Sequence, residues 1–346
     1  MRARMASDST NGATGWRIDT VTVPGDIVCC SLPAPTALAV DASASAGASN
    51  VNGVFEPGER VVVAPTWMNG GTTATFTLNG AASAFDGPAG ATYTLNDSAA
   101  AYGTLGHLAS AQCTDCYEMS IDNPAVRPAA HWDASFTETP AMSAPTAGPP
   151  PKTWTLHVGA SFADVPTSDL FYRFIETIFH NGVTGGCGAP GYCPANPALR
   201  KQMAVFLLKS SYGSAYVPPA AVGIFADVPQ ADTFAPWIED LYNRGITGGC
   251  SVSPLKYCPD NTVLRQQMAV FLLKTLEGST YVPPACTGVF PDVPCPSTFA
   301  PWIEDLAARG ITGGCGGGNF CPAAPNTRGQ MAVFLTKTFG LLLYGP

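Results

Sequence analysis

The sequence predicts a multidomain chain in which an all-β region is followed by an all-α region of three helix-loop-helix repeats. The block Phe162-Ala-Asp-Val-Pro166 recurs at Phe225 and at Phe290, at offsets of 63 and 65 residues. Residues 31–144 instead hold short Val-, Thr- and Tyr-rich segments separated by Gly, Asn, Asp and Pro, which is typical of strands and turns. A Pro-rich run separates the two regions, so we place a stiff linker over 145–160.

The first 30 residues have the pattern of the end of another domain. Gly15–Val23 alternates polar and apolar residues like a strand, and it resembles the closing strand of secreted jelly-roll modules. Met1–Asp8 lacks the apolar core of a signal peptide. Because other features indicate export, we expect residues 1–30 to be the residual strand of a truncated domain in a longer secreted protein.

The β-region is predicted over 31–144. Val61–Ala64, Thr73–Leu78 and Thr92–Leu95 are rich in residues that favour strands, and turn-forming residues separate them. Short strands with frequent turns predict a β-sandwich of immunoglobulin-like type.

The helical region divides into repeats at 161–223, 224–288 and 289–346. In the second repeat, Pro236–Arg244 reads as a helix that stops at Gly245, and a second helix is predicted over Val263–Leu276. A helix hairpin of this size cannot bury its apolar face alone, so the three repeats should share one core.

The twelve cysteines fall largely in pairs that are close in sequence, which predicts disulfides formed in an oxidising compartment. The predicted pairs are Cys113/Cys116, Cys187/Cys193, Cys250/Cys258, Cys286/Cys295 and Cys315/Cys321. Zinc is the alternative, but the pairs lack a second CxxC or a nearby histidine. Cys29 and Cys30 should bond elsewhere than to each other, because a vicinal bridge strains the peptide.

Charge, hydropathy and motif patterns argue against a nucleic-acid-binding protein, a membrane-spanning protein and an enzyme. The net charge of −8 argues against nucleic acid as a partner. No stretch reaches the roughly 18 apolar residues of a transmembrane segment. The four histidines lie singly in the sequence, and no HExxH, GxSxG or P-loop pattern occurs, so we expect no enzyme activity.

The three repeats resemble S-layer homology (SLH) domains. The matching features are the opening Phe-x-Asp-Val, the Gly-Ile/Val-Thr-Gly that ends the first helix, the aromatic-Cys-Pro step, and the Arg-x-Gln-Met-Ala helix. The resemblance implies a pseudo-threefold fold in which the three first helices form a central bundle. It also implies grooves between projecting lobes that bind cell-wall polysaccharide and hold exported proteins on the cell surface.

The family's ligand-binding segment, commonly Thr-Arg-Ala-Glu, maps by position to the start of each second helix. Its arginine corresponds to Arg200, Arg265 and Arg328, and glutamines replace its acidic residue at Gln202, Gln267 and Gln330. A guanidinium near a helix N-terminus suits an anionic sugar. The alternative is that each arginine caps or bridges within its own repeat.

Two further sets of residues recur in the repeats. Trp237 and Trp302 are candidates for stacking on sugar rings, although their helix spacing also fits a core position. Recurrent carboxylates are expected on a solvated helix face at Glu176, Glu239 and Glu304, and as acceptors of backbone N–H groups in the turn before the helix at Asp164, Asp227 and Asp292.

A calcium site is one interpretation of the loop that follows residue 49. Asn50, Asn52, Glu56 and Glu59 offer the oxygen ligands that Ca²⁺ uses, with Asp41 nearby. The other interpretation is a plain turn entering the Val61 strand.

These patterns favour a non-catalytic extracellular surface protein. Its repeats would attach to envelope polysaccharide, and its β-sandwich would act as a spacer or adhesion module. Two alternatives remain: a subunit that self-associates into a surface layer or filament, and the C-terminal part of a secreted hydrolase.

Overall fold

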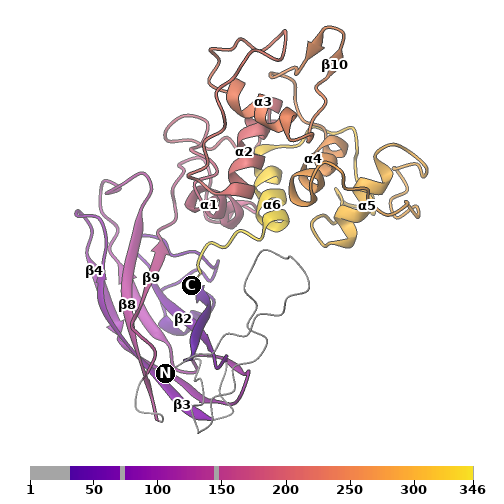
Figure 1. The fold of residues 1–346 in the computed structure, drawn as a ribbon. Helices are drawn as coiled ribbons and strands as arrows, with labels where there is room; N and C mark the ends of the chain where they lie inside the picture. Colours follow the sequence, from indigo (N-terminus) through magenta and orange to yellow (C-terminus); the bar gives the residue numbers. More distant parts are fainter. Residues whose placement is uncertain (1–31, 71–74, 144–147, 346) are drawn as a thin grey trace, which may run out of the picture.

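The computed structural model describes residues 32–70, 75–143 and 148–345, and it has the predicted order of a β-region followed by a helical region (Figure 1). Residues 1–31, which include the strand expected at Gly15–Val23 and the cysteines Cys29 and Cys30, lie outside the described part. Among the described residues no helix is long or apolar enough to cross a bilayer.

The β-region consists of two antiparallel sheets. The strand order of the first is β1 (Ala34–Val40), β2 (Arg60–Met68), β7 (Tyr117–Ile121) and β4 (Tyr93–Asp97), with β6 (Ser110–Gln112) also pairing with β2. The second has the order β5 (Ala99–Leu105), β3 (Phe76–Asp86), β8 (Asp133–Met142) and β9 (Lys152–His157). A short 3-10 helix spans Ala44–Ala46.

Strand β9 occupies part of the segment predicted to be a linker. It pairs with β8 from Asp133↔His157 to Glu138↔Lys152, and Trp154 and Leu156 are fully buried. The linker prediction for 145–160 is therefore wrong from Lys152 onward. Trp154 and Leu156 point to the same face of a strand and are buried in the core, which stabilises a strand here despite the preceding prolines.

A buried carboxylate organises the core of the β-region. Glu138 on β8 accepts hydrogen bonds from the indoles of Trp67 and Trp154 at 3.2 and 2.8 Å, and from Tyr117 Oη at 2.8 Å. Tyr102 Oη also donates to it. Burial and the charge of Glu138 raise the pKa of Tyr117, so the hydroxyl stays a donor. Gly80 has no space for a side chain, since a Cβ there would meet Tyr117 and Glu138.

The helical region contains α1 (Tyr172–His180), α2 (Arg200–Tyr212), α3 (Ala235–Asn243), α4 (Arg265–Glu277), α5 (Ala300–Ala308) and α6 (Arg328–Phe339), with a small hairpin of β10 (Ser251–Val252) and β11 (Leu255–Lys256). The two helices predicted for the second repeat correspond to α3 and α4, with ends shifted by one or two residues.

The central bundle is made by the second helix of each repeat. Helices α2, α4 and α6 pack against one another, while the first helices lie outside as the pairs α2–α3, α4–α5 and α6–α1 (Figure 1). The expectation that the first helices form the bundle is wrong. Met203, Met268 and Met331, at equivalent positions of the second helices, are fully buried.

A closed ring of backbone hydrogen bonds joins the three units just before these helices. Val263 N donates to Ala198 O, Asn326 N to Val263 O, and Ala198 N to Asn326 O, at 2.8–2.9 Å. The last repeat is thereby bonded to the first, and the helical region forms a closed cycle.

The C-terminal residues return to the β-region. Tyr344 is buried; its hydroxyl accepts from Phe55 N at 2.8 Å and donates to His157 O at 3.0 Å. The two regions therefore share a continuous core at this junction.

Candidate functional site

The three arginines at the helix starts lie between repeats rather than within them. Arg200, Arg265 and Arg328 are only 5%, 4% and 2% exposed. Each Nε donates at 2.8 Å to a main-chain carbonyl of another repeat: Arg200 to Tyr257, Arg265 to Phe320, and Arg328 to Tyr192. The interpretation that each arginine bridges within its own repeat is therefore wrong.

Aromatic rings enclose each guanidinium. The Arg328 guanidinium carbon lies 4.7 Å from the ring centroid of Tyr192 and 5.5 Å from that of Phe206, and Arg200 and Arg265 have equivalent pairs. Such stacking stabilises a desolvated cation. Burial nevertheless lowers the pKa of all three arginines; a guanidinium stays charged in proteins.

The arginines still have unused donors. Nη2 of Arg200 and Nη2 of Arg328 are buried without a hydrogen-bond partner, whereas Nη2 of Arg265 donates to Gly314 O at 3.1 Å. A buried unpaired donor costs about 1–3 kcal/mol. Two of the three arginines thus hold a donor that an anionic or carbonyl oxygen would satisfy.

Shallow pockets lie beside these two arginines. One, of about 200 Å³, is lined by Arg200, the Ile246–Gly249 turn, Lys274 and Phe299. Another, of about 260 Å³, is lined by Arg328, Asn196, Gln202 and Thr262. Each draws residues from more than one repeat. The pockets therefore coincide with the grooves between repeats.

The glutamines predicted as ligand-binding residues cap the helices. Oε1 of Gln202, Gln267 and Gln330 accepts from the backbone N–H of Leu199, Leu264 and Thr327 at 3.2 Å. Thr327 completes a capping box, because its Oγ1 accepts from Gln330 N at 3.2 Å. This satisfies a backbone donor at each helix start, and Gln202 and Gln267 also line the two pockets.

The two tryptophans are half-buried at the edge of the helical region. Trp237 packs edge-on against Tyr216, and Trp302 against Tyr281, with ring centroids 6.1 Å apart. Lys209 and Lys274 place their ammonium groups 6.0 Å from the Trp237 and Trp302 centroids. Since Lys274 also lines the Arg200 pocket, Trp302 lies beside that groove rather than in the central core.

The recurrent glutamates are buried, and the prediction of a solvated face is wrong. Glu239 accepts from the backbone N–H groups of residues 222–224 at 2.6–2.9 Å, and Glu304 does the same with residues 287–289 at 2.6–3.1 Å. Burial acts to raise the pKa of Glu304, but these backbone donors outweigh it and lower the pKa. These carboxylates hold in place the segment that leads into the repeat.

The recurrent aspartates bind backbone N–H groups as predicted, but in a different place. Asp227 accepts from Tyr257 N and Cys258 N at 2.8 Å, on the loop that follows the first helix. Asp164 and Asp292 hold the equivalent residues in their repeats. They position the aromatic residue whose carbonyl the arginine binds.

The five predicted disulfides are present in the structure. They join Cys113–Cys116, Cys187–Cys193, Cys250–Cys258, Cys286–Cys295 and Cys315–Cys321. Four of them lie in the helical region, three closing the loop between the helices of a repeat.

The loop proposed for calcium brings its oxygens together. Carboxylate atoms of Asp41, Glu56 and Glu59 lie within 4.8 Å of one another. Asn50 and Asn52 donate from their amides to Glu56 at 3.1 and 2.7 Å. Burial and the neighbouring Glu56 raise the pKa of Glu59 to about 8. These contacts also hold a turn without an ion, so calcium binding stays a prediction.

Comparison with known proteins identifies one family. Residues 290–332 match the S-layer homology domain, from the start of the third repeat into α6. No curated protein matches the sequence. An SLH domain therefore lies near the C-terminus, and domains of this kind bind cell-wall polysaccharide, which indicates a cell-surface or secreted protein.

Proposed function

We propose that the chain is a non-catalytic extracellular protein that attaches to anionic envelope polysaccharide through all three helical repeats. The match at 290–332 lies within the third repeat. Residues 161–223 and 224–288 carry the same sequence blocks and the same arginine-to-carbonyl contacts. On this proposal the three repeats form one SLH triplet with a groove at each junction.

The observation that carries the proposal is the pairing of cationic donors in the grooves. Arg200 and Lys274 line the same pocket, and Nη2 of Arg200 is buried without a hydrogen-bond partner. Lys209 occupies the equivalent position on α2, where its ammonium donates to Gly182 O at 3.2 Å. Carboxylate or phosphate groups on a polymer are the chemistry that such donors recognise. Weak sites on one rigid body add through effective concentration.

The β-region serves, in this proposal, as a spacer of immunoglobulin-like sandwich type. It packs on α1 and the C-terminal residues through a buried junction, so it would extend from the anchored face as a rigid unit.

The test compares two double variants of the full chain, each of which lacks two lysine charges. Lys209→Gln/Lys274→Gln should weaken binding to purified acidic wall polymer by about 100-fold if each lysine supplies a charge-assisted contact of roughly 1.5 kcal/mol. Lys152→Gln/Lys256→Gln removes two charges outside the grooves and should leave binding unchanged. Equal affinities for the two double variants would refute binding in the grooves.

A further inference from the structure

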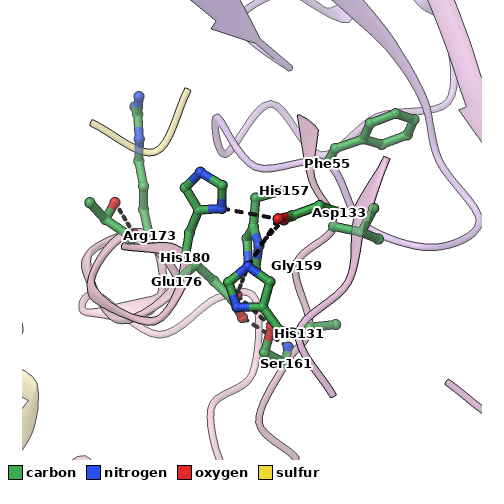
Figure 2. Close-up of polar contacts among 12 residues, drawn as sticks. Phe55, His131, Asp133, His157, Gly159, Ser161, Arg173, Glu176 and His180 are labelled. Atoms are coloured by element: carbon green, nitrogen blue, oxygen red, sulfur yellow. Dashed lines mark hydrogen bonds and ion pairs between the residues drawn. The ribbon is translucent and has the colours of Figure 1, made fainter. Parts of the chain in front are cut away.

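Three of the four histidines meet where the β-region joins the helical region. His131 lies just before β8, His157 ends β9, and His180 ends α1 (Figure 2). The β8–β9 register places Asp133 opposite His157. Ring centroids of the three histidines lie 5.0–5.8 Å apart.

The nitrogens of these histidines converge on the carboxylate of Asp133. His131 Nε2 lies 3.0 Å from Asp133 Oδ2, and both His157 Nδ1 and His180 Nδ1 lie 3.3 Å from Asp133 Oδ1. One ligand atom from each of the four side chains fits within 4.8 Å. A tetrahedral zinc site with bonds of about 2.0–2.1 Å has ligand-to-ligand edges of about 3.3–3.4 Å. The three distances from histidine nitrogens to Asp133 are close to this edge length.

A second carboxylate orients the buried histidine. Glu176 Oε2 lies 2.7 Å from His157 Nε2, and the side chains of His157 and Glu176 are 0% and 1% exposed. Glu176 also accepts from Ser161 N and Ser161 Oγ at 2.9 and 2.8 Å. Because a carboxylate that binds these donors acts as an acceptor, His157 donates to it from Nε2–H. His157 therefore presents Nδ1 to the cluster. A carboxylate behind the outer nitrogen is the arrangement that orients metal-bound histidine.

One of the converging nitrogens has an ion-pair contact but no well-aligned hydrogen bond. His180 Nδ1 is buried and makes no hydrogen bond, although it lies at ion-pair distance from Asp133. A buried ring nitrogen without a partner is destabilising unless something binds it. A metal ion between the rings would satisfy His180 Nδ1 and His157 Nδ1 together.

We propose that His131, Asp133, His157 and His180 bind one divalent transition-metal ion of the zinc type. Three imidazoles and one carboxylate favour zinc over calcium or magnesium, which prefer all-oxygen sites. The side chains of His131 and Asp133 are 41% and 33% exposed, so an ion reaches the site from solvent without unfolding. Four protein ligands make this a structural site.

The site would join two strands of the β-region to one helix of the helical region. His131 and Asp133 come from β8 and its approach, His157 from β9, and His180 from α1 (Figure 2). A bound ion fixes the β-region against the first helix of the repeats. This inference does not depend on polysaccharide binding.

The experiment titrates zinc into the full chain in competition with a chromophoric chelator. Because thiolates also bind zinc, Cys29→Ser/Cys30→Ser serves as the background. One equivalent should bind, and His131→Ala and His180→Ala should each weaken affinity by about 100-fold or more. Glu176→Gln should weaken it about 10–100-fold with the stoichiometry unchanged. His107→Ala, the remaining histidine, is the matched control and should bind as the background does.

A second readout does not depend on the variants folding. Cobalt added to the background protein should give the absorption spectrum of a tetrahedral nitrogen- and oxygen-ligated ion, and zinc should abolish it. Absence of that spectrum, or of stoichiometric zinc binding, would overturn the proposal. Equal zinc affinity of His131→Ala, His180→Ala and His107→Ala would overturn it as well.

Discussion

Arg328 Nε donates to the main-chain carbonyl of Tyr192 at 2.8 Å, a contact that links residues 136 positions apart. The hydroxyl of Tyr192 in turn donates to the carbonyl of Arg328 at 2.9 Å. With the equivalent contacts of Arg200 and Arg265, this pair closes the cycle of three repeats. A residue type that the family resemblance assigns to ligand binding is thus also part of the interface between repeats.

Arg328→Ala should destabilise the helical region substantially. The change leaves the Tyr192 carbonyl unpaired and removes a side chain that is stacked between two rings, so we expect a loss of about 3 kcal/mol or more. Denaturant unfolding followed by circular dichroism measures it. Arg309→Ala is the matched control, since Arg309 forms partly exposed pairs with Glu277 and Asp305 and should cost about 1 kcal/mol or less. Equal losses for the two variants would contradict the interface role.

Phe320→Tyr should stabilise the protein. The equivalent residues Tyr192 and Tyr257 donate from their hydroxyls to Arg328 O and Arg200 O, whereas Phe320 cannot make this bond to Arg265. A tyrosine there adds one buried hydrogen bond, worth about 0.5–1.5 kcal/mol. The reverse change, Tyr257→Phe, should cost a similar amount. A drop in melting temperature for Phe320→Tyr would show that the third junction differs in shape from the other two.

Glu138→Gln should destabilise the β-region although the side chain keeps its size. The carboxylate accepts from two indoles and two phenols, and an amide turns one acceptor into a donor that faces other donors. Unpaired buried donors cost about 1–3 kcal/mol each. Glu118→Gln, at the partly exposed pair with Arg60, should change stability by about 1 kcal/mol or less. Thermal unfolding of both variants decides whether Glu138 organises this core.

Calcium should raise the melting temperature of the wild-type chain. Asp41 and Glu56 are buried beside Glu59, and among the described residues no cation forms an ion pair with these three carboxylates. A hard divalent cation would relieve their repulsion. Glu56→Gln should lose the calcium-dependent shift, and magnesium should give a smaller one. A wild-type melting curve that calcium does not move would favour the plain-turn interpretation.

Local features of the sequence predicted much of the fold. The disulfides followed from cysteines a few residues apart, and the helices from blocks recurring around Pro236 and Arg265. Contacts between distant segments could not be predicted in this way. The sequence does not show that Arg265 binds a carbonyl near Phe320, or that the second helices rather than the first form the bundle.

The histidine cluster illustrates the same limit. His131, His157 and His180 lie singly in the sequence, and only the antiparallel register of β8 with β9 and the packing of α1 bring them together. Because residues 145–160 were expected to form a linker, the sequence did not predict that β9 pairs with β8. The burial of Glu239 and Glu304 against backbone N–H groups was not predicted, because a charged residue in a helix usually faces solvent.

Sedimentation of the purified full chain with cell-wall sacculi is the most direct test of envelope attachment. Native sacculi should pellet the protein, and sacculi stripped of their secondary polymers should leave it in solution. Lys209→Gln/Lys274→Gln should pellet less with native sacculi than Lys152→Gln/Lys256→Gln. Failure to pellet with native sacculi from any wall type, or pelleting that stripping does not reduce, would contradict a polysaccharide anchor.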